Sequence, residues 1–137
     1  MSSKTYINNK ISEIQKYLIS AESYKAHTRE KIENDDTIRL SLERILFLLT
    51  QATIDLGEMI IGYKKLRKAT TLKEIFAVVH EHNLIPLELR NKLMDMTGFR
   101  NILVHDYAKI NYDRVYEVLH KDLKDVEEFI ALAGSIK

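Results

Sequence analysis

Cysteine is absent from this chain of 137 residues, and proline and glycine are scarce, with one and four residues. The lack of cysteine excludes disulfides, thiolate zinc sites and a cysteine nucleophile. Because so few residues break helices, long uninterrupted helices are expected. Neither sign of charge is in excess, since 21 Lys and Arg face 20 Asp and Glu. No overall positive field indicates nucleic-acid binding, and any such site must be a local patch.

Long hydrophobic runs are also lacking. The longest uninterrupted runs, such as Ile45 to Leu49, have five residues, far below the roughly 20 apolar residues of a membrane-spanning helix. The N-terminal residues contain no apolar stretch typical of a signal peptide. We therefore expect a cytoplasmic protein with no membrane partner. With 45% hydrophobic residues, the chain is predicted to form one domain, residues 1–137, around one core.

What the sequence does contain is apolar residues at the period of a helix. The first series predicts a helix from Lys4 to Glu33, with an inner face of Ile7, Ile11, Ile14, Leu18 and Ala21. Asp35 or Asp36 is a suitable N-cap for a second helix, which Gly62 is placed to end. The inner face of this second helix is predicted to comprise Ile38, Leu42, Ile45, Leu49, Ala52, Leu56 and Ile60.

Three further helices are expected in the second half. A capping-box pattern at Thr71 to Glu74 predicts a helix through His82. Pro86 suits the first turn of the next helix, whose inner face is Leu89, Leu93 and Met96. The last helix is expected to begin at Asn111 or Asp113 and to end near Gly134, with Val115, Leu119, Val126, Phe129 and Ala133 inward. Nothing alternates with the period of a strand, so the predicted fold is an all-α, up-and-down bundle of four to five helices.

The histidines do not form a recognisable metal site. His80 and His82 are two residues apart, so on a helix they point in different directions. Glu117 and His120 form one E-x-x-H pair, but a di-iron bundle needs a second such pair, which the chain lacks. The sequence therefore predicts no metal and favours solvated helix surface at these positions.

A short basic segment follows the second helix, and its cationic residues are Lys64, Lys65, Arg67 and Lys68. These side chains are candidates for contacts with RNA phosphates. Alternatively, they form a solvated helix end that complements the helix dipole. Further along, Gly98 lies in the middle of a predicted helix, where it costs about 1 kcal/mol relative to alanine. It allows either close helix contact or local bending beside Arg100, and close packing is the expected reason.

The most informative stretch is FRNILVHDY, residues 99–107. The pattern R-x-x-x-x-H, here Arg100 and His105, is expected by chance about 0.26 times in a chain of this composition, and requiring a tyrosine two residues later lowers this to roughly 0.013. On a regular helix Arg100 and His105 lie about 140° apart, whereas Asn101 and His105 share a face. Arg100 and His105 therefore meet only if the helix distorts at its end or if a second molecule is involved. The apolar members Phe99, Ile102, Leu103 and Val104 are expected to anchor the helix by packing.

This stretch resembles the motif R-x-x-x-x-H-x-Y of the HEPN superfamily, and specifically of the HepT toxins of HepT–MntA toxin–antitoxin pairs. The resemblance extends over roughly residue 35 to the end, through Leu84-Ile85-Pro86 before the motif and Ala108-Lys109-Ile110 after it. It implies a two-fold homodimer in which the motif residues of both protomers line one cleft. It also implies metal-independent cleavage of RNA, tRNA or mRNA, by Arg100 and His105. Such a chain is the toxin of a type VII toxin–antitoxin pair.

The resemblance further implies a regulatory residue. In this family MntA, a minimal nucleotidyltransferase, transfers AMP from ATP to the tyrosine at the position of Tyr107, so ATP is used by the partner and the toxin itself needs no cofactor. An AMP group would add charge and bulk beside Arg100 and His105 and would repel the substrate phosphate. Tyr107 is a poor candidate for the catalytic base, because a phenol has a pKa near 10.

The chemistry is reasonable without the family. RNA supplies its own nucleophile, the 2′-hydroxyl. Histidine can serve as base or acid near neutrality, and arginine stays charged and matches phosphate oxygens. Asn101 and Asp106 are secondary candidates: Asn101 for a hydrogen bond to His105 or to substrate, Asp106 for orienting an imidazole or simply facing solvent. Two other functions stay open, namely a non-catalytic helical partner and a nucleotide-binding subunit of a minimal nucleotidyltransferase.

Overall fold

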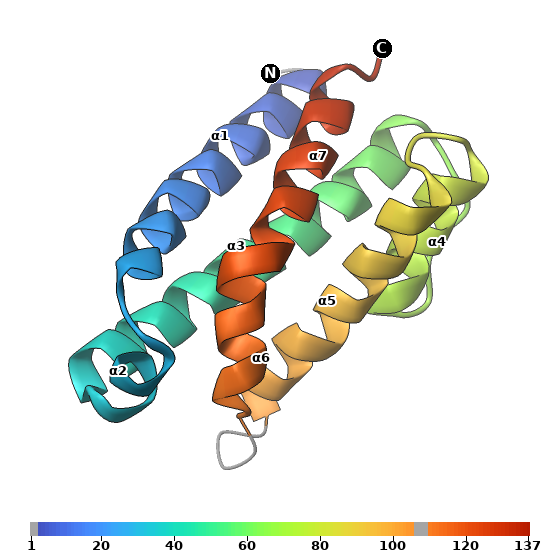
Figure 1. Ribbon diagram of the computed structural model, residues 1–137. Helices are drawn as coiled ribbons and strands as arrows, with labels where there is room; N and C mark the ends of the chain where they lie inside the picture. The colour runs from blue at the N-terminus through green and yellow to red at the C-terminus, as the bar shows by residue number, and fades with distance from the viewer. Residues whose placement is uncertain (1–2, 106–109) are drawn as a thin grey trace.

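Four long helical rods run up and down beside one another in the computed structural model, which describes residues 3–105 and 110–137 (Figure 1). Three of them are α1 (Ser3–Glu22), α3 (Asp36–Tyr63) and α5 (Leu87–His105). The fourth is a continuous run of α6 (Tyr112–Glu117), a π-helical turn η3 (Val118–Asp122) and α7 (Leu123–Gly134). The shorter α2 (Arg29–Asn34) and α4 (Leu72–Glu81) lie in the connections, and no strand occurs in the described ranges. The predicted all-α bundle is confirmed.

Helix α3 is the central element and contacts α1, α2, α4 and α5. Its 28 residues begin after Asp35, whose carboxylate accepts a hydrogen bond from the Ile38 backbone N–H at 3.1 Å, which confirms the predicted N-cap. By length and composition alone α3 could also cross a membrane, and it is the one helix of the described residues that could. More than half of its most apolar window is buried inside the bundle, as in the core helix of a soluble protein.

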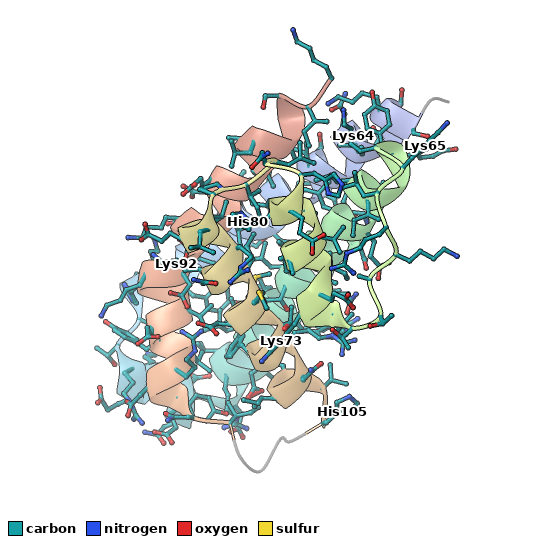
Figure 2. All side chains as sticks on the ribbon, turned by 90° about the vertical axis from the view of Figure 1, so that its right-hand side faces the viewer. Lys64, Lys65, Lys73, His80, Lys92 and His105 are labelled. Carbon is teal, nitrogen blue, oxygen red and sulfur yellow. The ribbon has the colours of Figure 1, made fainter. Side chains whose placement is uncertain are left out.

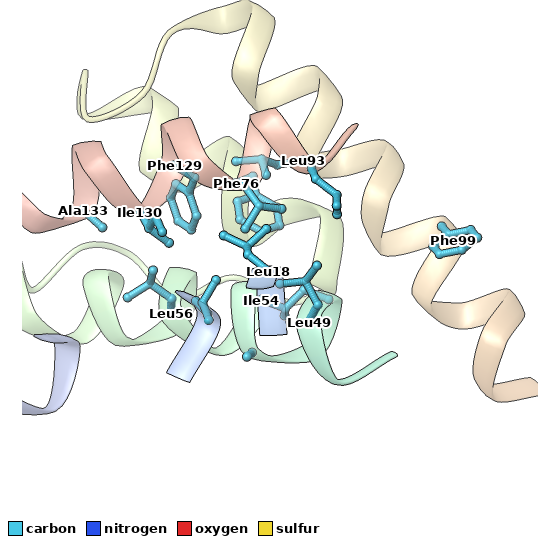
Figure 3. Close-up of a cluster of buried hydrophobic side chains, with 14 of the residues drawn as sticks. Leu18, Leu49, Ile54, Leu56, Phe76, Leu93, Phe99, Phe129, Ile130 and Ala133 are labelled. Carbon is cyan, nitrogen blue, oxygen red and sulfur yellow. The ribbon is translucent and has the colours of Figure 1, made fainter. Parts of the chain in front are cut away.

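The core lies where α3 faces the other rods. Phe76 of α4 and Phe129 of α7 are fully buried and meet edge to face, with ring centroids 5.6 Å apart (Figure 3). At Gly57 the backbone of α3 lies close to the Ile75 side chain of α4, because a Cβ placed there would lie 2.6 Å from Ile75 Cγ2. The predicted inward residues of the last helix are all buried: Val115, Leu119, Val126, Phe129 and Ala133.

Two predicted boundaries were wrong. The first helix does not run from Lys4 to Glu33: it stops at Glu22 and passes through a 3₁₀ turn η1 (Ser23–Ala26), and α2 starts afresh. The break is stabilised by Thr28, whose hydroxyl accepts from the Lys31 N–H as the N-cap of α2. Gly62 does not end α3, because the left-handed residue that follows the helix is Lys65, with a φ of 55°.

The last helix ends at Gly134 as predicted, but the π-helical turn η3 interrupts it, which the sequence did not indicate. Its start was correct, since the Asn111 side chain accepts from the Asp113 N–H as the N-cap of α6. The capping box of α4 forms in a shifted way: Thr71 accepts from the Glu74 N–H as predicted, but the Glu74 carboxylate reaches back to Thr70.

Candidate ribonuclease site

The register of α5 divides the motif between the core and the surface. Phe99 and Leu103 are buried and fix this part of α5 on the bundle. Ile102 was expected to pack inward, but it is 38% exposed, and Val104 is half-buried. The helix stays α-helical through His105, so no distortion brings Arg100 and His105 onto one face.

Arg100 leans against α3. Its Nε donates a 2.8 Å hydrogen bond to the Gln51 side-chain oxygen, and its guanidinium carbon lies 5.7 Å from the centroid of the Phe47 ring. Its Nη1 donates to the side-chain oxygen of the neighbouring Asn101 at 3.0 Å. Arg100 is half-buried in this arrangement. The partners that the described residues offer are therefore two neutral amide oxygens and an aromatic ring, which fix the guanidinium without cancelling its charge.

His105 has a different environment. It is exposed at the end of α5, at the lower edge of the molecule in Figure 2. Asn101 was predicted as a partner of His105 or of substrate. Its side-chain oxygen accepts a hydrogen bond from Arg100, and within residues 3–105 and 110–137 no hydrogen bond joins Asn101 to His105. Asp106 and Tyr107 lie outside the described residues.

Beside the motif, α3 and α5 enclose a surface hollow of about 360 Å³. Leu103 and Val104 line it from α5, and the residues from α3 are Leu40, Glu43, Arg44 and Phe47. Arg44 is exposed, and its guanidinium carbon lies 5.3 Å from the Phe47 ring centroid. Two arginines, Arg44 and Arg100, therefore flank one aromatic ring, and together they outnumber Glu43, the one carboxylate among the described residues that line the hollow.

The basic segment after α3 does not join this site. Lys64 and Lys65 lie at the end of the molecule opposite His105 (Figure 2). Arg67 is held in ion pairs with Glu81 and Glu74, whose hydrogen bonds raise its pKa. Hydrogen bonds from Thr70 and from Arg67 hold the pKa of Glu74 down at about 2. Lys68 lines a separate hollow of about 490 Å³ near the start of α4. A phosphate contact by these residues stays a prediction, and it would have to be made well away from the motif.

The histidines predicted to be unrelated to metal binding have other contacts. His80 Nδ1 is 2.8 Å from the Ile85 carbonyl oxygen, and His82 Nδ1 is 3.1 Å from that of Val78. The His120 ring stacks on Tyr116, with centroids 4.1 Å apart. Across the two described ranges, no three His, Asp or Glu side chains gather as metal ligands.

The sequence reasoning missed Gln51, Phe47 and Arg44. Each is on α3, and Gln51 is 49 positions before Arg100, so no local spacing connects them with the motif. The helical period of α3 could have placed Phe47 and Gln51 on one face, since they are four residues apart. Nothing in the sequence indicates that this face meets Arg100.

Comparison with known proteins agrees with the motif. The sequence profile described as "Ribonuclease HepT-like" matches residues 7–133. The chain belongs to the HepT-like ribonuclease family. This HepT-like chain is 35% identical over 95 residues to the mRNA nuclease HepT of Shewanella oneidensis, a match covering 69% of this chain and 68% of the relative. It is also 30% identical over 111 residues to the tRNA nuclease HepT of Aphanizomenon flos-aquae, covering 77% and 76%.

Solved structures show the same fold. The tri-AMPylated Shewanella oneidensis HEPN toxin, solved in complex with its MNT antitoxin, superimposes on this HepT-like chain with a TM-score of 0.86 and 29% identity, covering 99% of this chain and 100% of the toxin. A toxin–antitoxin structure with AMP-PNP also has a TM-score of 0.86, at 28% identity, covering 95% and 98%. The fold is HEPN-like, and the chain is a ribonuclease of the HepT type.

Proposed function

We propose that this protein is a metal-independent RNA endonuclease toxin that works as a homodimer, with a composite active site built from Arg100 and His105 of both protomers. One observation carries the proposal. The Arg100 side chain is hydrogen-bonded to Gln51 of α3, whereas His105 is exposed at the end of the uninterrupted helix α5. Because about 140° of helical rotation separates them, a second protomer is the simplest source of the missing partner.

The chemistry of such a cleft is complete without a metal. One histidine takes the proton of the 2′-hydroxyl, which attacks the adjacent phosphorus, and a second gives a proton to the departing 5′-oxygen. The arginines stabilise the negative charge that grows on the phosphate oxygens. One chain offers one motif histidine and a two-fold dimer offers two. Dimerisation therefore supplies both the base and the acid that the reaction needs.

The face around the motif supports this assembly. Leu40 is 59% exposed and Ile102 is 38% exposed, and both are large apolar side chains on the surfaces of α3 and α5. The hollow of about 360 Å³ beside Phe47 lies on the same elements. Burying this face against a second copy would remove apolar surface from water and would leave Arg44 near the cleft as a further phosphate contact.

Regulation by a nucleotidyltransferase is the second part of the proposal. The Shewanella toxin is AMPylated and bound to an MNT antitoxin, and by analogy an MntA-type partner transfers AMP from ATP to Tyr107 here. Replacing Tyr107 with Phe should leave RNA cleavage nearly unchanged and abolish inhibition by the partner with ATP. Persistent inhibition of that variant would show that the antitoxin blocks the toxin by binding alone.

Asp106 and the basic residues Lys64, Lys65, Arg67 and Lys68 have supporting roles at most. A cytoplasmic location fits an RNA substrate, either mRNA or tRNA as for the relatives.

Cleavage of RNA by purified protein in EDTA tests the proposed activity. Arg100→Ala and His105→Ala should each lower cleavage by about 10²- to 10³-fold. Arg90→Ala and His120→Ala are the matched controls, since Arg90 is half-buried on the same helix and His120 is exposed on η3. Full activity of either motif variant would refute the catalytic roles, and loss of cleavage in EDTA would refute the metal-independent mechanism.

A further inference from the structure

Arg100 is the first member of a hydrogen-bonded chain that continues along α3. The side-chain oxygen of Gln51 accepts from Arg100 Nε at 2.8 Å, and the Gln51 amide nitrogen donates to Asp55 Oδ1 at 2.9 Å. Gln51 and Asp55 are four residues apart, so they share a face of α3. Gln51 therefore connects the motif arginine with a carboxylate one helical turn further on.

The donor-to-acceptor direction of these two hydrogen bonds is fixed by the residues at both ends, Arg100 and Asp55. An arginine side chain can only donate hydrogen bonds, and an ionised carboxylate can only accept them. An amide between them has one orientation that satisfies both neighbours, with its oxygen toward Arg100 and its nitrogen toward Asp55. The reverse orientation would place two donors together at Arg100 and two acceptors together at Asp55. The half-buried positions of all three residues limit replacement of these bonds by water.

The side-chain amide of Gln51 that accepts from Arg100 is neutral. The negative charge is on Asp55, which is bonded to Gln51 and not to Arg100. A carboxylate in the place of Gln51 would pair with the guanidinium and compete with a substrate phosphate for it. An amide orients the guanidinium through Nε and leaves its charge available. The Phe47 ring, with its centroid 5.7 Å from the guanidinium carbon, supports the same placement.

We infer that Gln51, oriented by Asp55, is a positioning residue that sets the angle of the Arg100 guanidinium for contact with the scissile phosphate. The inference rests on the proposed function of Arg100 but concerns different residues. Its physical basis is that a displacement of about 1 Å in a catalytic group can cost on the order of 10²-fold in rate. Gln51 itself need not touch RNA.

The first test observes the hydrogen bond directly and does not depend on RNA cleavage. The Nε–Hε resonance of Arg100 can be assigned in ¹⁵N-labelled protein by its disappearance in Arg100→Lys. Replacing Gln51 with Leu should accelerate exchange of this proton with solvent by about 5- to 10-fold, because one hydrogen bond of ordinary strength is lost. Asp55→Ala should have a smaller effect in the same direction. Gln15→Leu, the same change at an exposed position of α1, should have none. An unchanged exchange rate in Gln51→Leu would overturn the inference.

The second test is a double-mutant cycle on RNA cleavage. Gln51→Leu should lower kcat by about 10- to 100-fold, but in an Arg100→Ala background it should cost no more than about twofold. An equal loss in both backgrounds would show that Gln51 acts independently of Arg100 and would overturn the inference. The proposed function fails in a different way, namely by full cleavage in Arg100→Ala alone.

The third test separates orientation from charge. Gln51→Glu keeps an acceptor beside Arg100 Nε, so slow exchange of the Hε proton should persist. The new carboxylate would pair with the guanidinium, so KM for RNA should rise while folding is retained. Wild-type kinetics in Gln51→Glu would show that a neutral partner is not needed and would overturn this part of the inference. A purely structural role for Gln51 predicts no such divergence between exchange and KM.

Discussion

Replacing Gly57 or Gly98 with alanine gives two variants whose stabilities can be compared directly, because the gain in helix propensity is the same for both. Both lie inside long helices, α3 and α5, so replacing either with alanine gains about 1 kcal/mol of helix propensity. A Cβ at Gly98 would meet nothing within 4 Å, whereas a Cβ at Gly57 would lie 2.6 Å from Ile75 Cγ2 and 3.3 Å from Phe76 Cε1. The open space at Gly98 contradicts the expectation that close packing explains this glycine.

Ordinary contacts between carbon atoms are about 3.5–4.0 Å, so the Ile75 side chain or the whole of α4 must move by about 1 Å to accept Gly57→Ala. Inserting a methyl group into a packed core costs about 1–3 kcal/mol. Because the propensity gain is common to both variants, Gly57→Ala should be less stable than Gly98→Ala by about 1–3 kcal/mol. Urea unfolding at equal protomer concentration measures this difference. Equal stability of the two variants would refute the close approach of α3 and α4.

Three other changes have signs fixed by the structure. Tyr112→Phe removes a 2.8 Å hydrogen bond to Glu43 and should lower the free energy of unfolding by about 1–2 kcal/mol. Burial and this bond raise the pKa of Tyr112 to about 12. The bond's contribution to stability is therefore complete below pH 10 and declines above it, as urea unfolding from pH 8 to 11 would show. Asp125→Asn should stabilise the protein at pH 7, because burial raises the pKa of this carboxyl despite Lys92 at 3.6 Å; the gain should vanish below about pH 4, where both states bind the proton. Asp35→Ala removes the N-cap of α3 and should cost about 1 kcal/mol, measured as a fall in the urea midpoint.

Signals that lie within a few residues of one another predicted most of the fold. The N-caps Asp35, Thr71 and Asn111 were identified from the sequence, because a capping side chain and the N–H groups it accepts from are neighbours in the chain. The break after Glu22 was missed although it had a signal. No Ile, Leu, Val, Met or Phe occurs between Ala21 and Ile32, a gap too long for one continuous helical stripe.

Features that depend on tertiary packing could not be predicted. The π-helical turn η3 is one such feature, and its Val118 and Leu119 are buried in the bundle. No local residue type requires this turn. The motif pair, Arg100 and His105, was predicted from local spacing, whereas Gln51 and Phe47, which contact Arg100, come from α3, so only the assembled bundle reveals them.

Mixed dimers test the central claim, a composite site shared by two protomers. Wild-type and His105→Ala chains carrying different affinity tags can be produced together, and the dimer that carries both tags can be isolated. In a shared cleft this mixed dimer has lost one of the two histidines that act as base and acid. We predict RNA cleavage on the order of tenfold or more below that of the wild-type dimer. If the mixed dimer keeps about half of the wild-type activity, each chain carries its own site and the composite site is refuted.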